Sequence, residues 1–375
     1  MTSSLGGLQV LDFSRVLAGP FATMMLADLG ARVTKIERPG TGDDTRSWGP
    51  PHDDQGEATY FQAVNRNKDS LVLDLTVPAD LRQARLLAAT ADVVVENFRP
   101  GVMDRLGLGY DALTADNPGL IYCSVTGFGR GAGAALPGYD LLVQALGGLM
   151  SLTGSVEGEP QKAGVALVDV LAGLFATVGI LAAVAHRTTS GQGQRVEVDL
   201  LSCLLAALVN QGSAFTVAGV VPTRMGNAHP SIAPYEVLPT GDGDLVLAVG
   251  TDRQFALFCQ VVGAPELAGD PRFATNPDRV AHRDDLRNRL VILLSARPAA
   301  EWSALLTPAG VPAGVVNTIA GAFALATELD LEPVVQLPRP DGSAVALTKN
   351  PIGLSATPVV YRSAPPLLGE QPSGA

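Results

Sequence analysis

The apolar segment 165–185 restricts the fold of this chain more than any other feature of its sequence. Thr177 and Asp169 are its only polar residues, and a charge in such a run is costly unless neighbouring groups satisfy it. The segment is about long enough to span a bilayer. However, an Asp in a span is unfavourable, and a His-Arg pair at 186–187 leads directly into a Gly-rich turn. The sequence therefore favours a buried helix over a membrane span.

This helix carries small residues at spacings of four, three and four, which place them on one face where another backbone can approach closely. They are Ala172, Ala176, Gly179 and Ala183. Gly191 is predicted to end the helix in the left-handed conformation. Asp169 then falls in or near the first turn, where the helix dipole favours an anion. Asp169 is thus either a helix cap or an ionised nucleophile, and its position alone leaves both interpretations open.

The composition indicates a globular protein with a large core and more than one domain. Of 375 residues, 47% are hydrophobic and 17% charged, and the formal net charge is −11. An acidic chain is a poor partner for nucleic acid or anionic membranes. The N-terminal residues contain no signal-peptide pattern. The scattered cysteines are typical of a reducing cytoplasm, and neither they nor the histidines have metal-ligand spacing. These residues are Cys123, Cys203, Cys259, His52, His186, His229 and His282.

The first 37 residues predict a β-α-β unit of a parallel sheet, with strands at 8–13 and 31–37 and a helix at 19–29. Glu37 stands where a ribose ligand would stand in a dinucleotide-binding fold. The turn reads SRVLAGP, however, and lacks the GxGxxG spacing that lets a pyrophosphate approach the backbone. The sequence therefore argues against a nicotinamide enzyme.

Further strand and helix patterns alternate along the chain up to residue 209. Strands are predicted at 70–75, 92–96, 120–125 and 195–198, and helices at 79–91, 139–153 and 200–209. The loop TGFGRGAGAALPG at 126–138 is interpreted as a flexible surface or lid loop, or as a phosphate-binding nest.

A Pro- and Gly-rich connection at 212–234 separates this region from a compact α+β segment. A hairpin is predicted from strands at 235–238 and 245–249, joined by the turn GDGD at 241–244. Helices are predicted at 252–262, 283–296, 300–309 and 320–329, and strands within 334–346.

Taken together, several motifs resemble the class III coenzyme A transferases, the formyl-CoA transferase and carnitine-CoA transferase (CaiB/BaiF) family. The resemblance covers essentially the full length, and its specificity lies in the shared order of the motifs. They are LDFSRVLAGPFATMMLADLGARVTKIERPGTGDDTR, NRNKDSLVLDL, VENFRPGVMDRLG, YCSVTGFG, GYDLLVQALGGLMSLTG, the Asp169 helix ending in HRTTSGQGQ, and APPLLGE. The stretches GDDTRSWGPP, HPSIAPYEVL and DRQF look most similar to the succinyl-CoA:dicarboxylate (glutarate) branch.

The resemblance implies an α/β fold with a Rossmann-like large domain and a small α+β domain. It also implies an open-ring protomer interlocked with its twin as a homodimer. The expected boundaries are 1–209 for the first part of the large, CoA-binding domain, 210–227 for a linker and 228–310 for the small domain. Residues 311–375 are expected to return to and complete the large domain.

The resemblance assigns Asp169 as the nucleophile. The resemblance also implies a set of residues that bind CoA, namely Arg38, Arg105, Leu73, Asp74, Leu75, Thr76, Asn97, Phe98, Arg99, Tyr139 and Asp140. It further implies that Leu17, Ala18, Gly250 and Thr251 line the active site. Leu17 replaces the glutamine of formyl-CoA transferases and Thr76 a CoA-contacting lysine, which argues against formate or oxalate as substrate.

The implied reaction transfers CoA from an acyl-CoA, such as succinyl-CoA, to a free dicarboxylic acid through acyl-anhydride and aspartyl-CoA intermediates. It requires no metal and no tightly bound cofactor, and we expect the protein to be cytoplasmic. An α-methylacyl-CoA racemase of the same fold is one alternative, although its histidine is replaced by Tyr139 here. A non-catalytic CoA-binding protein is the other. The sequence does not specify the pair of acids.

Overall fold

The computed structural model describes residues 3–370, which divide into two compact units. Unit 1 contains the chain up to Leu149, the segment Lys162–Val220 and the chain from Glu332 onward. Unit 2 contains Met150–Gln161 and Val221–Leu331. The expected boundaries differ in detail, because segment 150–161 belongs to unit 2 and much of the expected linker is helical. Residues 371–375 of the last expected segment lie outside the described residues.

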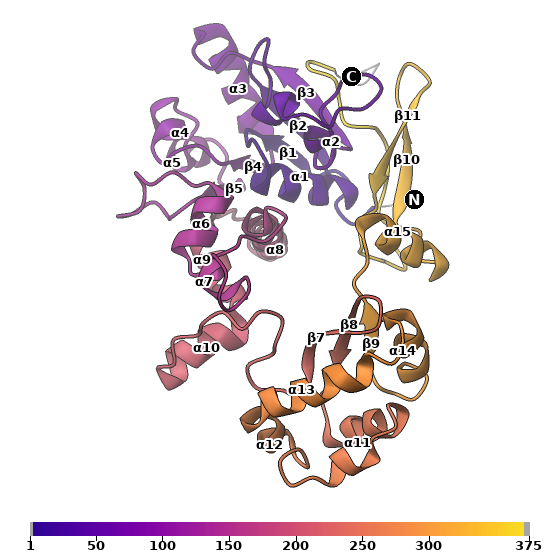
Figure 1. The fold of residues 1–375 in the computed structure, drawn as a ribbon. Coiled ribbons are helices and arrows are strands. Elements are labelled where there is room, and N and C mark those ends of the chain that lie inside the picture. Colours follow the sequence, from indigo (N-terminus) through magenta and orange to yellow (C-terminus); the bar gives the residue numbers. More distant parts are fainter. Residues whose placement is uncertain (1–2, 371–375) are drawn as a thin grey trace. The chain divides into compact units, whose positions relative to one another are not determined.

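Unit 1 is built on a six-stranded parallel sheet with the order β3-β2-β1-β4-β5-β6 (Figure 1). The strands are β1 Gln9–Asp12, β2 Arg32–Glu37, β3 Lys68–Val72, β4 Val93–Glu96, β5 Ile121–Thr126 and β6 Arg195–Asp199. The predicted α/β fold with a parallel sheet is confirmed. The strand order reverses between β1 and β4, and in such sheets ligands bind outside the carboxyl ends of the strands at this point.

Helices cover both faces of this sheet, as its nearly continuous apolar strands require. In β4, Val93 and Val95 point into a core shared with α1 and α8, whereas Val94 points into a core shared with α3. The helices of the chain before unit 2's main segment are α1 Ala18–Asp28, α2 Thr59–Gln62, α3 Pro78–Thr90, α4 Val102–Arg105, α5 Tyr110–Thr114, α6 Asp140–Leu146, α7 Leu149–Leu152, α8 Leu167–Ser190, α9 Leu200–Ala207 and α10 Val209–Ala218.

The long apolar helix α8 packs against α1, and Ala172, Ala176 and Ala183 of the predicted small-residue face lie in the core that the two helices share. Gly179 lies instead against Val196 of β6. Ala172 and Ala176 are fully buried, and a β-carbon on Gly173 would lie only 2.7 Å from the carbonyl oxygen of Ala18. Gly191 ends the helix with φ 70°, as predicted. By length and composition alone α8 could cross a membrane. In unit 1, however, one face of it forms part of the core.

The expected helix 139–153 is interrupted. It forms two short helices, α6 and α7, because Gly147 ends the first and Gly148 adopts φ 86°, a conformation that a continuing helix excludes. The two glycines that the sequence placed inside one helix therefore mark its break.

Unit 2 has a three-stranded antiparallel sheet, β7-β8-β9, with the predicted hairpin as its first two strands. Phe255, Phe258 and Trp302 fill the core between this sheet and the surrounding helices. The elements are β7 Tyr235–Pro239, β8 Asp244–Ala248, α11 Asp252–Val261, α12 Asn276–Ala281, α13 Arg283–Leu294, α14 Ala299–Leu306, β9 Ala313–Val315 and α15 Ile319–Glu328.

The chain then re-enters unit 1 through the hairpin of β10 Val334–Pro338 and β11 Ala344–Thr348. The segment after it runs beside β3. The amide of Asn67 donates to the carbonyl of Ser363 at 3.1 Å, and the amide of Ser70 donates to that of Glu370 at 2.9 Å. This C-terminal segment therefore covers the free edge of the sheet.

Candidate active site

A cavity of about 870 Å³ lies in unit 1 where the strand order reverses. Its walls include residues 15–18 after β1, 97–100 after β4 and 125–129 at the end of β5. Segments 133–141 and 162–170 contribute further lining residues, including the first turn of α8. The cavity therefore occupies the position at which a doubly wound sheet binds its ligand.

Asp169 lines this cavity from the first turn of α8. Its carboxylate is half-buried and makes no hydrogen bond or ion pair with any residue of 3–370. The cap of α8 comes from Asp140 instead, whose Oδ1 accepts the amide hydrogens of Val168 at 2.8 Å and of Asp169 at 3.3 Å. The interpretation of Asp169 as the helix cap is therefore wrong, and its carboxylate remains available to a ligand.

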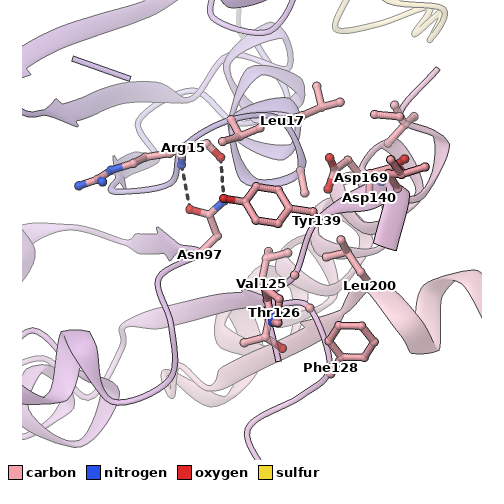
Figure 2. Close-up of a pocket in the computed structure, with 18 of the residues that line it drawn as sticks. Arg15, Leu17, Asn97, Val125, Thr126, Phe128, Tyr139, Asp140, Asp169 and Leu200 are labelled. Atoms are coloured by element: carbon pink, nitrogen blue, oxygen red, sulfur yellow. Dashed lines mark hydrogen bonds between the residues drawn. The ribbon is translucent and has the colours of Figure 1, made fainter. Parts of the chain in front are cut away.

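Burial, and then the nearby negative charge of Asp140, raise the pKa of Asp169 to about 7. The expectation that the helix terminus keeps this carboxylate readily ionised is thus incorrect. The α8 amides that would stabilise its charge are directed at Asp140. A carboxylate that is poorly stabilised as an anion is a stronger nucleophile once it is ionised. Figure 2 shows the two carboxylates together at the cavity wall.

Asp140 is held in place by a buried amide. The Nε2 atom of Gln144, one turn later on α6, donates to Asp140 Oδ2 at 2.6 Å, and its Oε1 accepts the amide hydrogen of Ala163 at 2.8 Å. This chain of bonds also fixes the backbone next to Lys162, which lines the cavity with an exposed side chain. The Lys162 ammonium donates to the carbonyl of Ala163 at 3.1 Å and has no carboxylate partner among residues 3–370.

At the β1–β4 side of the cavity, Asn97 holds the main chain of Arg15 from both sides (Figure 2). The Arg15 amide donates to Asn97 Oδ1 at 2.9 Å, and Asn97 Nδ2 donates to the Arg15 carbonyl at 2.7 Å. The Arg15 guanidinium lies 4.7 Å from the centre of the Phe98 ring and has no ion-pair partner among the described residues. Burial and the nearby Arg38 lower its pKa. An anionic ligand would relieve this repulsion between cations.

The structure brings eight of the predicted site residues to this cavity. They are Leu17, Ala18, Asn97, Phe98, Arg99, Tyr139, Asp140 and Asp169.

The other predicted residues lie elsewhere. Leu73 is buried in the core beneath α3, and the Asp74 carboxylate accepts from the amide and hydroxyl of Thr76 in the turn that precedes α3, which also contains Leu75. Arg38 pairs with Asp44, which itself lines the cavity, and Arg105 is exposed at the end of α4. Gly250 and Thr251 belong to unit 2, where Thr251 Oγ1 caps α11.

Sequence reasoning missed Arg15, Lys162, Trp48 and Tyr60 as lining residues. Arg15 could have been found, because it directly follows a strand at the expected carboxyl edge of the sheet. Lys162 comes from an irregular segment. Trp48 and Tyr60, whose ring centres lie 5.4 Å apart, come from the stretch GDDTRSWGPP and from α2, where no pattern marked either of them as a lining residue. Within residues 3–370, no cluster of three or more His, Cys, Asp or Glu side chains is arranged to hold a metal ion.

Comparison with protein families gives a match over residues 5–372 to the model described as CoA-transferase family III. A succinate–glutarate CoA-transferase of Agrobacterium fabrum is 44% identical, with 98% of this chain and 93% of the relative aligned. The succinyl-CoA:glutarate CoA-transferase of Mus musculus is 40% identical over 98% of this chain and 84% of its own length. An acetyl-CoA:oxalate CoA-transferase of Acetobacter aceti is 45% identical over 84% of this chain and 81% of its own length.

Solved structures agree with these sequence relatives. A CaiB/BaiF family protein from Brucella suis superimposes with a TM-score of 0.87 and 42% identity, covering 99% of this chain and 97% of the other. A protein from Mycobacterium tuberculosis gives a TM-score of 0.88 at 32% identity, with 98% of each chain covered.

Proposed function

This chain belongs to CoA-transferase family III, and from that premise we propose that it transfers CoA from succinyl-CoA to glutarate or a similar dicarboxylic acid. The family membership makes it a CoA-transferase, and relatives named for succinate and glutarate support the choice of acids. The observation that carries the proposal is the Asp169 carboxylate, which lines the cavity and has no hydrogen-bond or ion-pair partner within residues 3–370.

The proposed reaction uses Asp169 first as the nucleophile that accepts the succinyl group and then as the acyl group that the CoA thiolate attacks. Its ionised oxygen attacks the thioester carbonyl, the C–S bond breaks and CoA leaves as the thiolate, which yields a mixed anhydride. The thiolate then attacks the Asp169 carbonyl, the C–O bond of the anhydride breaks and succinate leaves. Asp169 now carries CoA as a thioester. The steps balance without a net proton or electron, so no redox cofactor takes part.

The second half of the reaction reverses these steps with the new acid. The incoming carboxylate attacks the aspartyl thioester and releases the CoA thiolate. The thiolate then attacks the acyl carbonyl of the new anhydride, which forms the product thioester and restores Asp169. Apolar residues beside Asp169, including Leu17, Ala166 and Val170, limit the water that would otherwise hydrolyse the anhydride.

Cations along the cavity suit the two charged parts of the substrates. Arg15 and Arg99 line the cavity, and Arg38 lies near Arg15. They are suited to the phosphates of CoA, because guanidinium groups bind phosphate in a bidentate manner. Lys162 lies in the segment that leads into α8 and lines the same cavity as Asp169. We assign it to the second carboxylate of a dicarboxylic acid, a group that a monocarboxylic acid lacks.

Trapping of the intermediate tests this function. The protein is incubated with succinyl-CoA and treated with hydroxylamine or borohydride, and its peptides are analysed by mass spectrometry. We expect the modification on Asp169, and none in Asp169→Asn. A label on another residue, or undiminished exchange in the Asn variant, would exclude the proposed role of Asp169. Free dicarboxylic acids screened against succinyl-CoA then identify the acceptor.

The two alternative functions would give different results in simple assays. A racemase would exchange the α-proton of a 2-methylacyl-CoA with deuterium in heavy water, and we expect none, because Tyr139 stands where that branch has histidine. A CoA-binding protein without activity would bind CoA but produce no new thioester.

We also propose a homodimer of interlocked protomers, located in the cytoplasm. Large apolar side chains are exposed along the α8–α10 region, for example Val178 at 63%, Phe215 at 58% and Val217 at 85%. A second chain would cover such a surface. The three cysteines are buried free thiols, which suits a reducing compartment. A stable, active single chain in light scattering would exclude the dimer.

A further inference from the structure

Val16, in the wall of the cavity, adopts a backbone conformation that its side chain disfavours. Its φ is 68°, in the left-handed region, and a β-branched residue there is a clear outlier. It lies between Arg15 and Leu17, and all three line the cavity. Such a conformation persists only where the surroundings hold it in place, and it is typically found at functional sites.

A buried ion pair holds the main chain on both sides of Arg15. Asp43 Oδ1 accepts the amide hydrogen of Val16 at 3.2 Å, and Asp43 Oδ2 lies 2.8 Å from the ammonium of Lys35. That ammonium also donates to the carbonyl of Ser14 at 2.8 Å. Asp43 is 2% exposed and Lys35 is fully buried, so water does not compete for these bonds. Together with Asn97, which holds Arg15, the pair fixes consecutive peptide groups at 14–16.

This strained turn determines where α1 begins. The Leu17 carbonyl accepts the first hydrogen bond of the helix, from the amide of Phe21 at 2.7 Å. The next residue, Ala18, packs against Gly173 of α8, the helix that carries Asp169. A change in the backbone at Val16 would therefore move the part of the cavity wall that Leu17 and Ala18 form next to α8.

We propose that Asp43 is a positioning residue for CoA transfer, because it holds Val16 in the left-handed conformation and thereby fixes Leu17 and Ala18 in the same cavity wall as Asp169. This inference rests on the proposed function for its activity readout. Asp43 does not touch the reacting atoms. It acts through the backbone of Val16, and the Lys35 ammonium anchors its second oxygen.

A double-mutant cycle tests the proposal. Glycine adopts positive φ without cost, so the Val16→Gly background no longer needs Asp43 to hold the turn. We expect Asp43→Asn to lower kcat about 10-fold or more in the natural background, and less than about 3-fold in the Val16→Gly background. If Asp43→Asn does not fold, Asp43→Ser takes its place in the same cycle.

The control is Asp28→Asn, which breaks another buried pair, with Arg66, at the far end of α1. We expect it to lower Tm while leaving kcat close to that of the natural protein. An equal loss of kcat from Asp43→Asn in both backgrounds would reduce Asp43 to a general stabilising residue and overturn the proposal.

Hydrogen exchange separates this proposal from the proposed function. We expect Asp43→Asn to increase amide exchange in the peptide that covers residues 14–18, and Asp28→Asn to leave it unchanged. This result would support the positioning role even if the natural protein transferred no CoA to any acid. Unchanged protection in Asp43→Asn would overturn it even if transfer were observed.

Discussion

The carboxylate of Asp140 accepts the amide hydrogen of Asp169 at 3.3 Å, while its negative charge contributes to the raised pKa of the Asp169 carboxyl. One acid therefore uses the amides at the start of α8, and the other is left less stabilised as an anion. This arrangement links the geometry of the helix terminus to the reactivity of the proposed nucleophile.

Asp140→Asn should shift the pH dependence of the reaction. Transfer requires ionised Asp169, so kcat/KM of the natural protein should fall as the pH drops through about 7. Without the Asp140 charge, the pKa of Asp169 falls and this acid limb moves to lower pH. It should not reach the ordinary range of an Asp, because burial is the larger cause of the shift.

The control for this variant is Gln144→Met, which removes the hydrogen bond to Asp140 but keeps its charge. Its acid limb should not move to lower pH. Burial and the charges of Asp169 and Asp140 raise the pKa of Tyr60. The ionisation of Tyr60 is therefore followed in parallel by its absorbance. An unchanged acid limb in Asp140→Asn would contradict the electrostatic coupling.

Asp169→Asn should be more stable than the natural protein at neutral and alkaline pH. The folded pKa of about 7 is above the unfolded value of 3.8, so ionisation is harder in the folded state. The natural protein therefore loses stability as the pH rises from about 4 to 7. Asn avoids this cost, on the order of 1–3 kcal/mol for the half-buried group. Denaturant unfolding at pH 5 and pH 8 measures the difference in unfolding free energy between Asp169→Asn and the natural protein. The same difference at both pH values would contradict the prediction.

Local patterns predicted the sheet and the end of α8 well, because they depend on neighbours in sequence. Gly191 ends α8 as its position suggested, and the apolar strands pair in parallel. The cap of α8 could not be predicted in this way. It comes from Asp140, 29 residues before Asp169, through a contact that only the folded chain creates.

Contacts between residues far apart in sequence also limited the prediction of the site. The resemblance indicated Asp169 and Tyr139, since these lie in recognisable motifs. It also implies a CoA contact at Leu73, whose side chain is buried in the core at 3% exposure, so this contact stays a prediction. The position of Arg15 after β1 could indicate a place at the cavity, but no residue pattern reveals that its guanidinium has no ion-pair partner among residues 3–370. Asn97 lies at the cavity as expected, and its amide also holds the Arg15 backbone, which no sequence pattern indicated.

Gly173→Ala should destabilise the protein by about 1–3 kcal/mol, because the new methyl group would clash with backbone. Its β-carbon would lie 2.7 Å from the Ala18 carbonyl oxygen, so α1 and α8 would have to separate. Gly179→Ala is the matched control on the same helix. It gains similar helix propensity, and its β-carbon would meet a Val196 methyl group at 2.7 Å, which can move more easily than backbone. Equal Tm values for both variants would contradict this packing.

Lys162→Met should change the choice of acceptor acid rather than the chemistry. The methionine keeps most of the length and apolar contact of the side chain but removes the charge. A hydrogen-bonded ion pair with the distal carboxylate is worth about 1.5–3 kcal/mol, so kcat/KM for glutarate should fall roughly 10- to 100-fold. With butyrate, which has no second carboxylate, it should change by less than about 3-fold. Lys162→Arg keeps the charge and should retain most of the preference for glutarate. A parallel loss with both acids would show instead that Lys162 supports the backbone near Ala163, and the second carboxylate would then have to bind elsewhere.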